Sequence, residues 1–152
     1  ESGGLLCNII HALIFISYFK CNLSLQLDKN YDLIDSKRNN YKEMYGKFYN
    51  DNIIISCDNN TNNLNMLFTE GKYKLIIKAS NVINFYYYEN NILISEFTKD
   101  FLHTSSWVQK EYENLLLHKN TTFCSYDRGY NAHKSLFDPL KCVFKSKLLP
   151  IT

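Results

Sequence analysis

The feature that constrains this chain most is a series of five short apolar and aromatic stretches between Asn52 and Phe97, with polar turn residues between them. β-branched and aromatic side chains favour strands, and the pairs Glu70-Gly71, Ser80-Asn81 and Glu89-Asn90 favour tight reversals. Connections this short leave no room for a crossover helix, so neighbouring strands must run antiparallel. The predicted strands are Asn52–Cys57, Leu64–Thr69, Lys72–Ala79, Val82–Tyr88 and Asn91–Phe97.

Weaker strand signals flank this central meander. The first begins at Tyr45, and later ones lie at 105–109, 121–126 and 140–144, whereas 109–119 fits either a short helix or a hairpin. Seven or eight strands with few glycines favour an all-β, up-and-down antiparallel meander that curls into a partly closed barrel. We expect a polar lead-in over 25–44, the barrel over 45–128 and an exit segment over 129–152.

The N-terminus carries a separate signal. Leu5 to Phe19 is a mostly apolar run of fifteen residues, followed by Lys20 and polar sequence. A membrane-spanning helix needs about 20 apolar residues, so no stable membrane anchor is expected. The run matches the apolar core of a secretory signal peptide, which predicts a signal over 1–24 and a secreted or lysosome-like endomembrane location. A buried N-terminal helix is the alternative.

Secretion would place the cysteines in an oxidising compartment, where thiols usually pair. Cys57 and Cys124 both fall in strand-like segments, and a disulfide between them would connect an early strand to a late one. Three Asn-x-Ser/Thr sequons predict N-glycosylation of a secreted chain, at Asn22, Asn59 and Asn120.

Composition and motifs argue against several classes of function. The formal net charge is +2, and basic residues are scattered among acidic ones, so nucleic acid is not an expected partner. The four histidines lack metal-ligand spacing, no glycine-rich phosphate loop occurs, and Glu111 and Glu113 lack apolar surroundings that would raise a carboxyl pKa. We therefore expect no catalytic residues, no metal and no cofactor.

The aromatic run Phe85, Tyr86, Tyr87 and Tyr88 is the strongest binding feature. Side chains alternate along a strand, so two of these rings should face inward and two outward. Packing inside the barrel is one interpretation of the run, and an exposed face that meets a partner is the other.

Several motifs follow one another along the chain: Gly46-Lys-Phe48, Cys57, the hairpin from Glu70 to Glu89, Thr104-Ser-Ser-Trp107-Val108 and Phe123-Cys124. Their order resembles the exclusion domain of dipeptidyl-peptidase I (cathepsin C), including the versions in apicomplexan parasites. The resemblance covers about 45–126, and Phe48 stands where that family has tryptophan. It implies a barrel packed against a papain-like protease domain, a disulfide between Cys57 and Cys124, and structural roles for Gly46, Phe48 and Trp107.

Two functions are compatible with these observations. The resemblance implies a secreted accessory domain without chemistry of its own, which closes part of a papain-like cleft so that the protease removes dipeptides. The alternative is a lipocalin-like secreted binder of small apolar ligands, since Gly46-x-Phe48 also resembles the lipocalin Gly-x-Trp motif, or a surface protein that contacts a host protein. The accessory domain and the lipocalin-like binder differ in whether the interior is packed or hollow.

Overall fold

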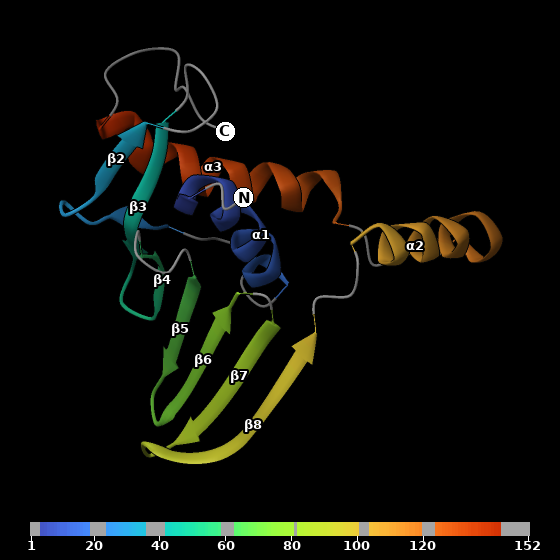
Figure 1. Ribbon diagram of the computed structural model, residues 1–152, viewed down its shortest axis with the longest axis horizontal. Coiled ribbons are helices and arrows are strands. Elements are labelled where there is room, and N and C mark those ends of the chain that lie inside the picture. Colours follow the sequence, from blue (N-terminus) through green and yellow to red (C-terminus); the bar gives the residue numbers. More distant parts are fainter. Residues whose placement is uncertain are drawn as a thin grey trace.

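The computed structural model describes residues 4–18, 24–35, 42–58, 63–80, 82–100, 104–119 and 124–143. These residues form eight strands and three helices (Figure 1). In chain order they are α1 (Gly4–Ser17), β1 (Gln26–Leu27), β2 (Asp32–Asp35), β3 (Lys42–Tyr49), β4 (Ile53–Cys57), β5 (Leu64–Glu70), β6 (Tyr73–Ala79), β7 (Val82–Glu89), β8 (Ile92–Asp100), α2 (Thr104–His118) and α3 (Tyr126–Val143).

The strands form one antiparallel sheet in the order β1-β3-β4-β5-β6-β7-β8, and β2 pairs with β3 beside β1. From β3 onward each strand pairs with the next one in the sequence. The predicted all-β antiparallel meander is therefore confirmed, and the five strands predicted between Asn52 and Phe97 correspond to β4–β8.

The sheet is not closed into a barrel, and this part of the prediction is wrong. Among the described residues, β8 pairs with β7 alone and leaves its other edge open. Segments predicted to supply further strands are helical: 105–109 lies in α2, and 140–143 lies in α3. Ala132, Leu136 and Leu140 are buried at a spacing of four, which is the period of one helix face.

Local geometry explains the tight hairpin between β7 and β8. Asn90 and Asn91 have φ values of 49° and 63°, and two successive residues with positive φ form the turn that matches the twist of paired strands. Asparagine tolerates this conformation better than most residues. The predicted turn pair Glu89-Asn90 therefore lies one residue too early.

Gly46 stands where β3 changes partners, because β2 pairs with residues 42–45 and β1 pairs with Phe48 and Tyr49. Its φ is 148°, and a Cβ at this position would lie 3.0 Å from Tyr31 Cβ. A side chain would strain the backbone and push against the segment that joins β1 to β2. Glycine is therefore required by both conformation and space.

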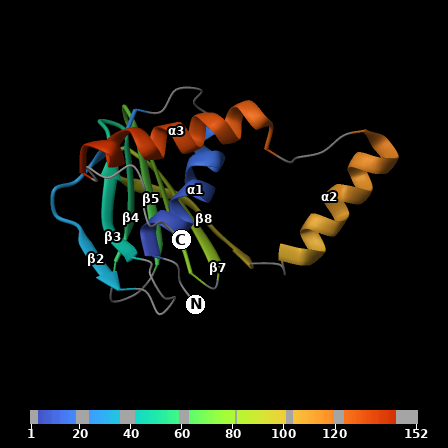
Figure 2. The same cartoon turned by 90° about the horizontal axis from the view of Figure 1, so that it is seen from above.

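The core lies between α1 and one face of the sheet. Leu5, Ile9, Leu13 and Ile16 are buried at helical spacing, and α1 packs against β3, β4, β5 and α3. Seen from above, α1 lies beside the sheet and α3 runs across it (Figure 2). Residues 4–17 thus adopt the buried-helix alternative, and cleavage of a signal peptide stays a prediction. No helix within the described ranges is long and apolar enough to cross a membrane.

We expect Gly46→Ala to destabilise the chain more than Gly71→Ala. Both glycines have positive φ, but a Cβ on Gly71 meets nothing within 4 Å, whereas one on Gly46 meets Tyr31. Gly71 at φ 56° lies in the left-handed helical region, where another residue costs about 1 kcal/mol, whereas Gly46 at φ 148° lies outside it. The difference between the two losses therefore reports the extra backbone strain and the steric clash at Gly46 together. Urea unfolding of the two variants would measure it, and equal losses would contradict the assigned role of Tyr31.

Truncation inside α1 should be costly. Leu13 is fully buried, so Leu13→Ala should lower the free energy of unfolding by about 2–5 kcal/mol. Leu116→Ala, at an exposed position of α2, should change it by less than about 0.5 kcal/mol. Chemical unfolding followed by circular dichroism would compare them, and a neutral Leu13→Ala would show that α1 is not part of the core.

Candidate interaction surface

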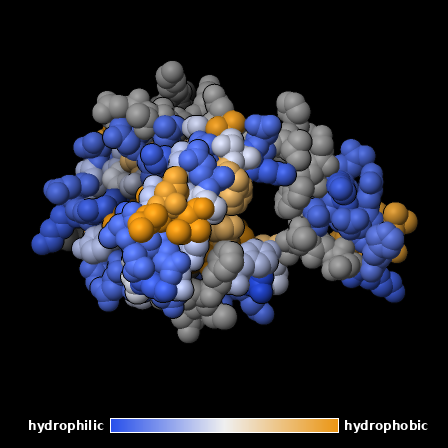
Figure 3. Space-filling view, turned by 90° about the horizontal axis from the view of Figure 1, so that it is seen from below, coloured by the Kyte–Doolittle hydropathy of each residue, from blue (hydrophilic) through white to orange (hydrophobic). Residues whose placement is uncertain are grey.

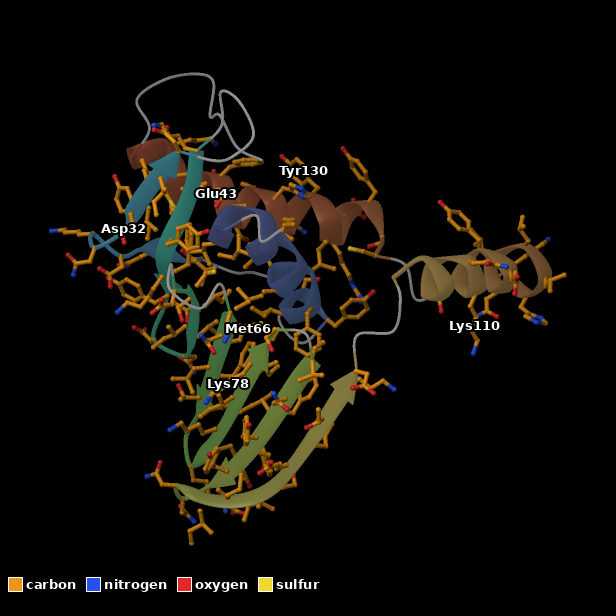
Figure 4. The ribbon with its side chains drawn as sticks, in the orientation of Figure 1. Asp32, Glu43, Met66, Lys78, Lys110 and Tyr130 are labelled. Carbon is orange, nitrogen blue, oxygen red and sulfur yellow. The ribbon has the colours of Figure 1, made fainter. Side chains whose placement is uncertain are left out.

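The face of the sheet that meets α1, here called the inner face, is covered at one end only. Four buried side chains lie on the inner face in register from β3 to β6: Phe48, Ile55, Met66 and Ile77. Figure 4 shows Met66 at the end of the sheet next to α1. The helix packs against β3, β4 and β5, so the inner face of β7 and β8 extends beyond it.

Five apolar and aromatic side chains occupy this uncovered end. The register continues from Ile77 to Phe85 and from Phe85 to Phe97, and Tyr73, Tyr87 and Ile92 share that face. Tyr73 is 43% exposed, Phe97 56% and Ile92 66%. We call this set the aromatic surface: Tyr73, Phe85, Tyr87, Ile92 and Phe97.

The four rings of the aromatic surface are arranged in two stacked pairs. Phe85 and Phe97 face each other across β7 and β8 with ring centroids 4.4 Å apart and planes 8° apart. Tyr73 and Tyr87 stack at 6.1 Å and 14°. Each such pair contributes about 0.5–1.5 kcal/mol beyond its buried area, so the rings are held in place without a covering helix.

The turn between β7 and β8 extends the apolar region. Ile94 is an extra residue in β8, because Tyr87 pairs with Ser95 while Tyr88 pairs with Leu93. Such a bulge bends the strand and changes the face to which the following side chains point. Figure 3 shows apolar side chains gathered on this end of the molecule, where Ile92, Leu93 and Ile94 are exposed.

Charges occur at the rim of the aromatic surface. Lys72 forms an ion pair with Glu89, and its ammonium lies 5.2 Å from the centroid of the Tyr73 ring. These two charges neutralise each other beside the rings, so they can remain at a solvated edge when a partner covers the apolar centre. An apolar centre with a polar rim is the usual organisation of protein–protein interfaces.

The opposite, outer face of the sheet has a different character. Lys74 lies 5.5 Å from the Tyr88 ring centroid and Lys78 lies 5.6 Å from the Tyr86 centroid, each across the β6–β7 ladder. These cross-strand pairs stabilise a solvated face. The predicted partner run is therefore divided: Phe85 and Tyr87 lie on the inner face, and Tyr86 and Tyr88 on the outer.

The two cysteines predicted to pair are free thiols in this structure. Cys57 is buried on the inner face of β4, and burial raises the pKa of its thiol to about 11. A protonated, buried thiol reacts slowly. Cys124 precedes α3, where its Sγ lies 3.4 Å from the Ser125 carbonyl oxygen, and not in the predicted strand.

The remaining predicted site residues are placed as follows. Gly46 and Phe48 lie on β3, and Phe48 is fully buried under α1. Trp107 belongs to α2 and not to a strand, which is a correction, because α2 continues unbroken from Thr104 to His118. Among the described elements α2 packs against no other, and Figure 4 shows its Lys110 far from the sheet. The three sequon asparagines, Asn22, Asn59 and Asn120, lie outside the described residues.

Sequence analysis missed part of the aromatic surface. Tyr73 and Phe97 belong to neighbouring strands, and only the register shows that they share a face with Phe85 and Tyr87. The alternation of side chains in 72–79 places Tyr73 on the same face as Leu75 and Ile77. This alternation was the one sequence signal that could have assigned Tyr73 to the inner face. The bulge at Ile94 interrupts the alternation of side chains along β8, so simple counting from Phe97 assigns Ile92 to the wrong face.

The burial of Cys57 predicts a pH dependence of stability. The thiol pKa rises from 9.0 to about 11 on folding, so the unfolded chain loses this proton first as pH increases. The free energy of unfolding should therefore fall between about pH 9 and 11 because of this group. Urea unfolding should show a smaller fall for Cys57→Val, and identical pH profiles would contradict the burial of the thiol.

Comparisons with known proteins add no relative. No protein-family description, curated protein or solved structure matches this chain significantly. In the described part of the chain, no three side chains of His, Cys, Asp or Glu gather where they could hold a metal ion. The aromatic surface is therefore the candidate functional site on geometry alone.

Proposed function

We propose that this chain is a non-catalytic binding module that attaches to a folded protein partner through its aromatic surface. The observation that carries the proposal is the contrast along one face of the sheet. Under α1, Phe48 and Ile55 are completely buried, whereas Phe97 and Ile92 on the same face are more than half exposed. Contiguous apolar surface that a chain leaves uncovered commonly marks an interaction site.

The ring arrangement suits binding. Tyrosine and phenylalanine offer large contact areas with few rotatable bonds, so little side-chain entropy is lost when a partner orders them. The stacked pairs Phe85–Phe97 and Tyr73–Tyr87 are already in place before binding. Aromatic residues near the centre of an interface often supply most of the binding free energy.

The partner that we propose is a papain-like cysteine protease domain, which is the partner that the exclusion-domain resemblance implies. A rigid sheet end docked beside a substrate cleft would limit the cleft to two residues, so the protease would release dipeptides. We place this association in a secreted or endomembrane compartment. The burial of α1 in the core supports retention of residues 4–17 in the working protein, so the proposed compartment rests on the exclusion-domain resemblance and not on removal of these residues as a signal peptide.

The lipocalin-like alternative has less support, because such a protein needs space inside its sheet. The inner face of β3–β5 is filled by α1, where Leu5, Ile9 and Leu13 are fully buried against the strands. A surface that meets a macromolecule fits the exposed end of the sheet better than a cavity does.

The double variant Tyr73→Ser/Phe97→Ser should weaken binding to a papain-like protease domain by about tenfold or more. The reason is the loss of two exposed rings from the centre of the proposed interface. Interferometry with the immobilised protease domain would measure affinity, and mass spectrometry of a digested peptide would show whether the chain shifts products toward dipeptides.

Tyr88→Ser is the matched control, since it removes a ring from the outer face of the same strands. Its affinity should equal that of the wild-type chain, and circular dichroism should show that all variants are folded. Equal binding by the control and the double variant would contradict docking through the aromatic surface. An unchanged product pattern would exclude the restriction of a protease.

A further inference from the structure

The free edge of β8 is the other unusual feature of the sheet. All nine residues of β8 are exposed, and β7 is its only neighbour among the described strands. The opposite edge of the sheet is occupied by the short strands β1 and β2, and β2 carries the exposed Asp32 and Asp35. Short, charged edge strands discourage further pairing, whereas a long free edge with unpaired backbone groups invites it.

We propose that two copies of this chain associate by antiparallel pairing of β8 with β8, with Phe97 of each copy facing Phe97 of the other. The pairing occupies the free edge and continues the sheet from one copy into the next. It does not rest on the proposed protease partner, which docks on a face and not on an edge, although Phe97 contributes to both surfaces.

Symmetry restricts the register of this pairing. A two-fold axis perpendicular to the sheet keeps the inner faces of both copies on the same side. Residues that oppose each other in an antiparallel ladder point to the same side, so the central residue must oppose itself. Ile94 interrupts the alternation, which leaves the regular stretch from Ser95 to Asp100 for pairing.

Charge selects one register among those that remain. Centring on Glu96, Lys99 or Asp100 would oppose two like charges, and centring on Thr98 would oppose Glu96 to Asp100 of the other copy. Directly opposed like charges destabilise a sheet. A centre at Ser95 would draw the bulged Ile94 into the ladder.

The register centred on Phe97 avoids these conflicts. It opposes Ser95 to Lys99 and Glu96 to Thr98, and no residues of like charge face each other. On the inner face it extends the Phe85–Phe97 stack into a row of four rings across the two copies, because neighbouring strands lie about 4.8 Å apart. Aromatic pairs across strands are among the favourable cross-strand pairs.

A charge series at position 98 tests this register. Thr98→Glu places a carboxylate opposite Glu96 of the other copy at two symmetric positions, and Thr98→Lys places an ammonium there. Both variants lose the same hydrogen bond from Thr98 Oγ1 to Asn84 Oδ1, 2.8 Å long, so they are matched. Sedimentation should show about tenfold weaker dimerisation for Thr98→Glu than for the wild type, and tighter dimerisation for Thr98→Lys.

The double variant Glu96→Lys/Thr98→Glu places an ammonium opposite the new carboxylate, so it should restore the dimerisation that Thr98→Glu alone weakens. Positions 96 and 98 lie on the outer face, so the aromatic surface and its binding of a protease are unchanged by these variants. Circular dichroism would verify that each variant folds. A wild-type chain that stays monomeric up to about 1 mM, or a Thr98 series without the predicted order and rescue, would overturn the proposal.

Discussion

The packing of α1 against the inner face of β3, β4 and β5 is the contact on which the rest of the structure depends. An antiparallel meander has two faces, and a stable domain needs a second layer over at least one of them. Here that layer is a single apolar helix, whose Ile9 and Leu13 meet strands that contribute Phe48 and Ile55. Full burial of such side chains contributes about 1.5–3 kcal/mol each, so this small interface provides much of the free energy that stabilises the core.

The limited length of α1 also explains the candidate site. Fourteen helical residues extend over about 21 Å, which is enough to cover one end of the sheet and not the other. α3 packs on α1 and β1, so it adds nothing over β7 and β8. The inner face of the last strands is thus left to aromatic side chains that stack on one another, and the same strands end in an open edge. The exposed inner face and the open edge of β8 are thus two separate surfaces for binding another protein chain.

Much of the fold could be predicted because its signals are local. Strand residues such as Ile53 and Tyr86 and the turn at Asn90 need only their neighbours in sequence, and β4–β8 were found this way. The helices were harder. In residues 131–138 the buried face of the helix is marked by an apolar residue only once in every four, so this short segment gives no clear helix signal. Trp107 lies in a segment whose spacing of apolar residues matches neither a helix nor a strand clearly. Two of the five residues of the aromatic surface were predicted, since Phe85 and Tyr87 were named as a partner face. Tyr73, Ile92 and Phe97 were not.

The sequence by itself determined which side chains share a face of each regular strand, since the two-residue repeat of a strand is a property of the backbone. The bulge at Ile94 in β8 is the exception. It also determined where the meander turns, through residues such as Gly71 and Asn90 that adopt positive φ. Only the tertiary structure decided which part of a face becomes core and which remains surface. That outcome depends on where α1 docks and on β8 finding no further strand among the described residues, and both are contacts between segments far apart in the chain.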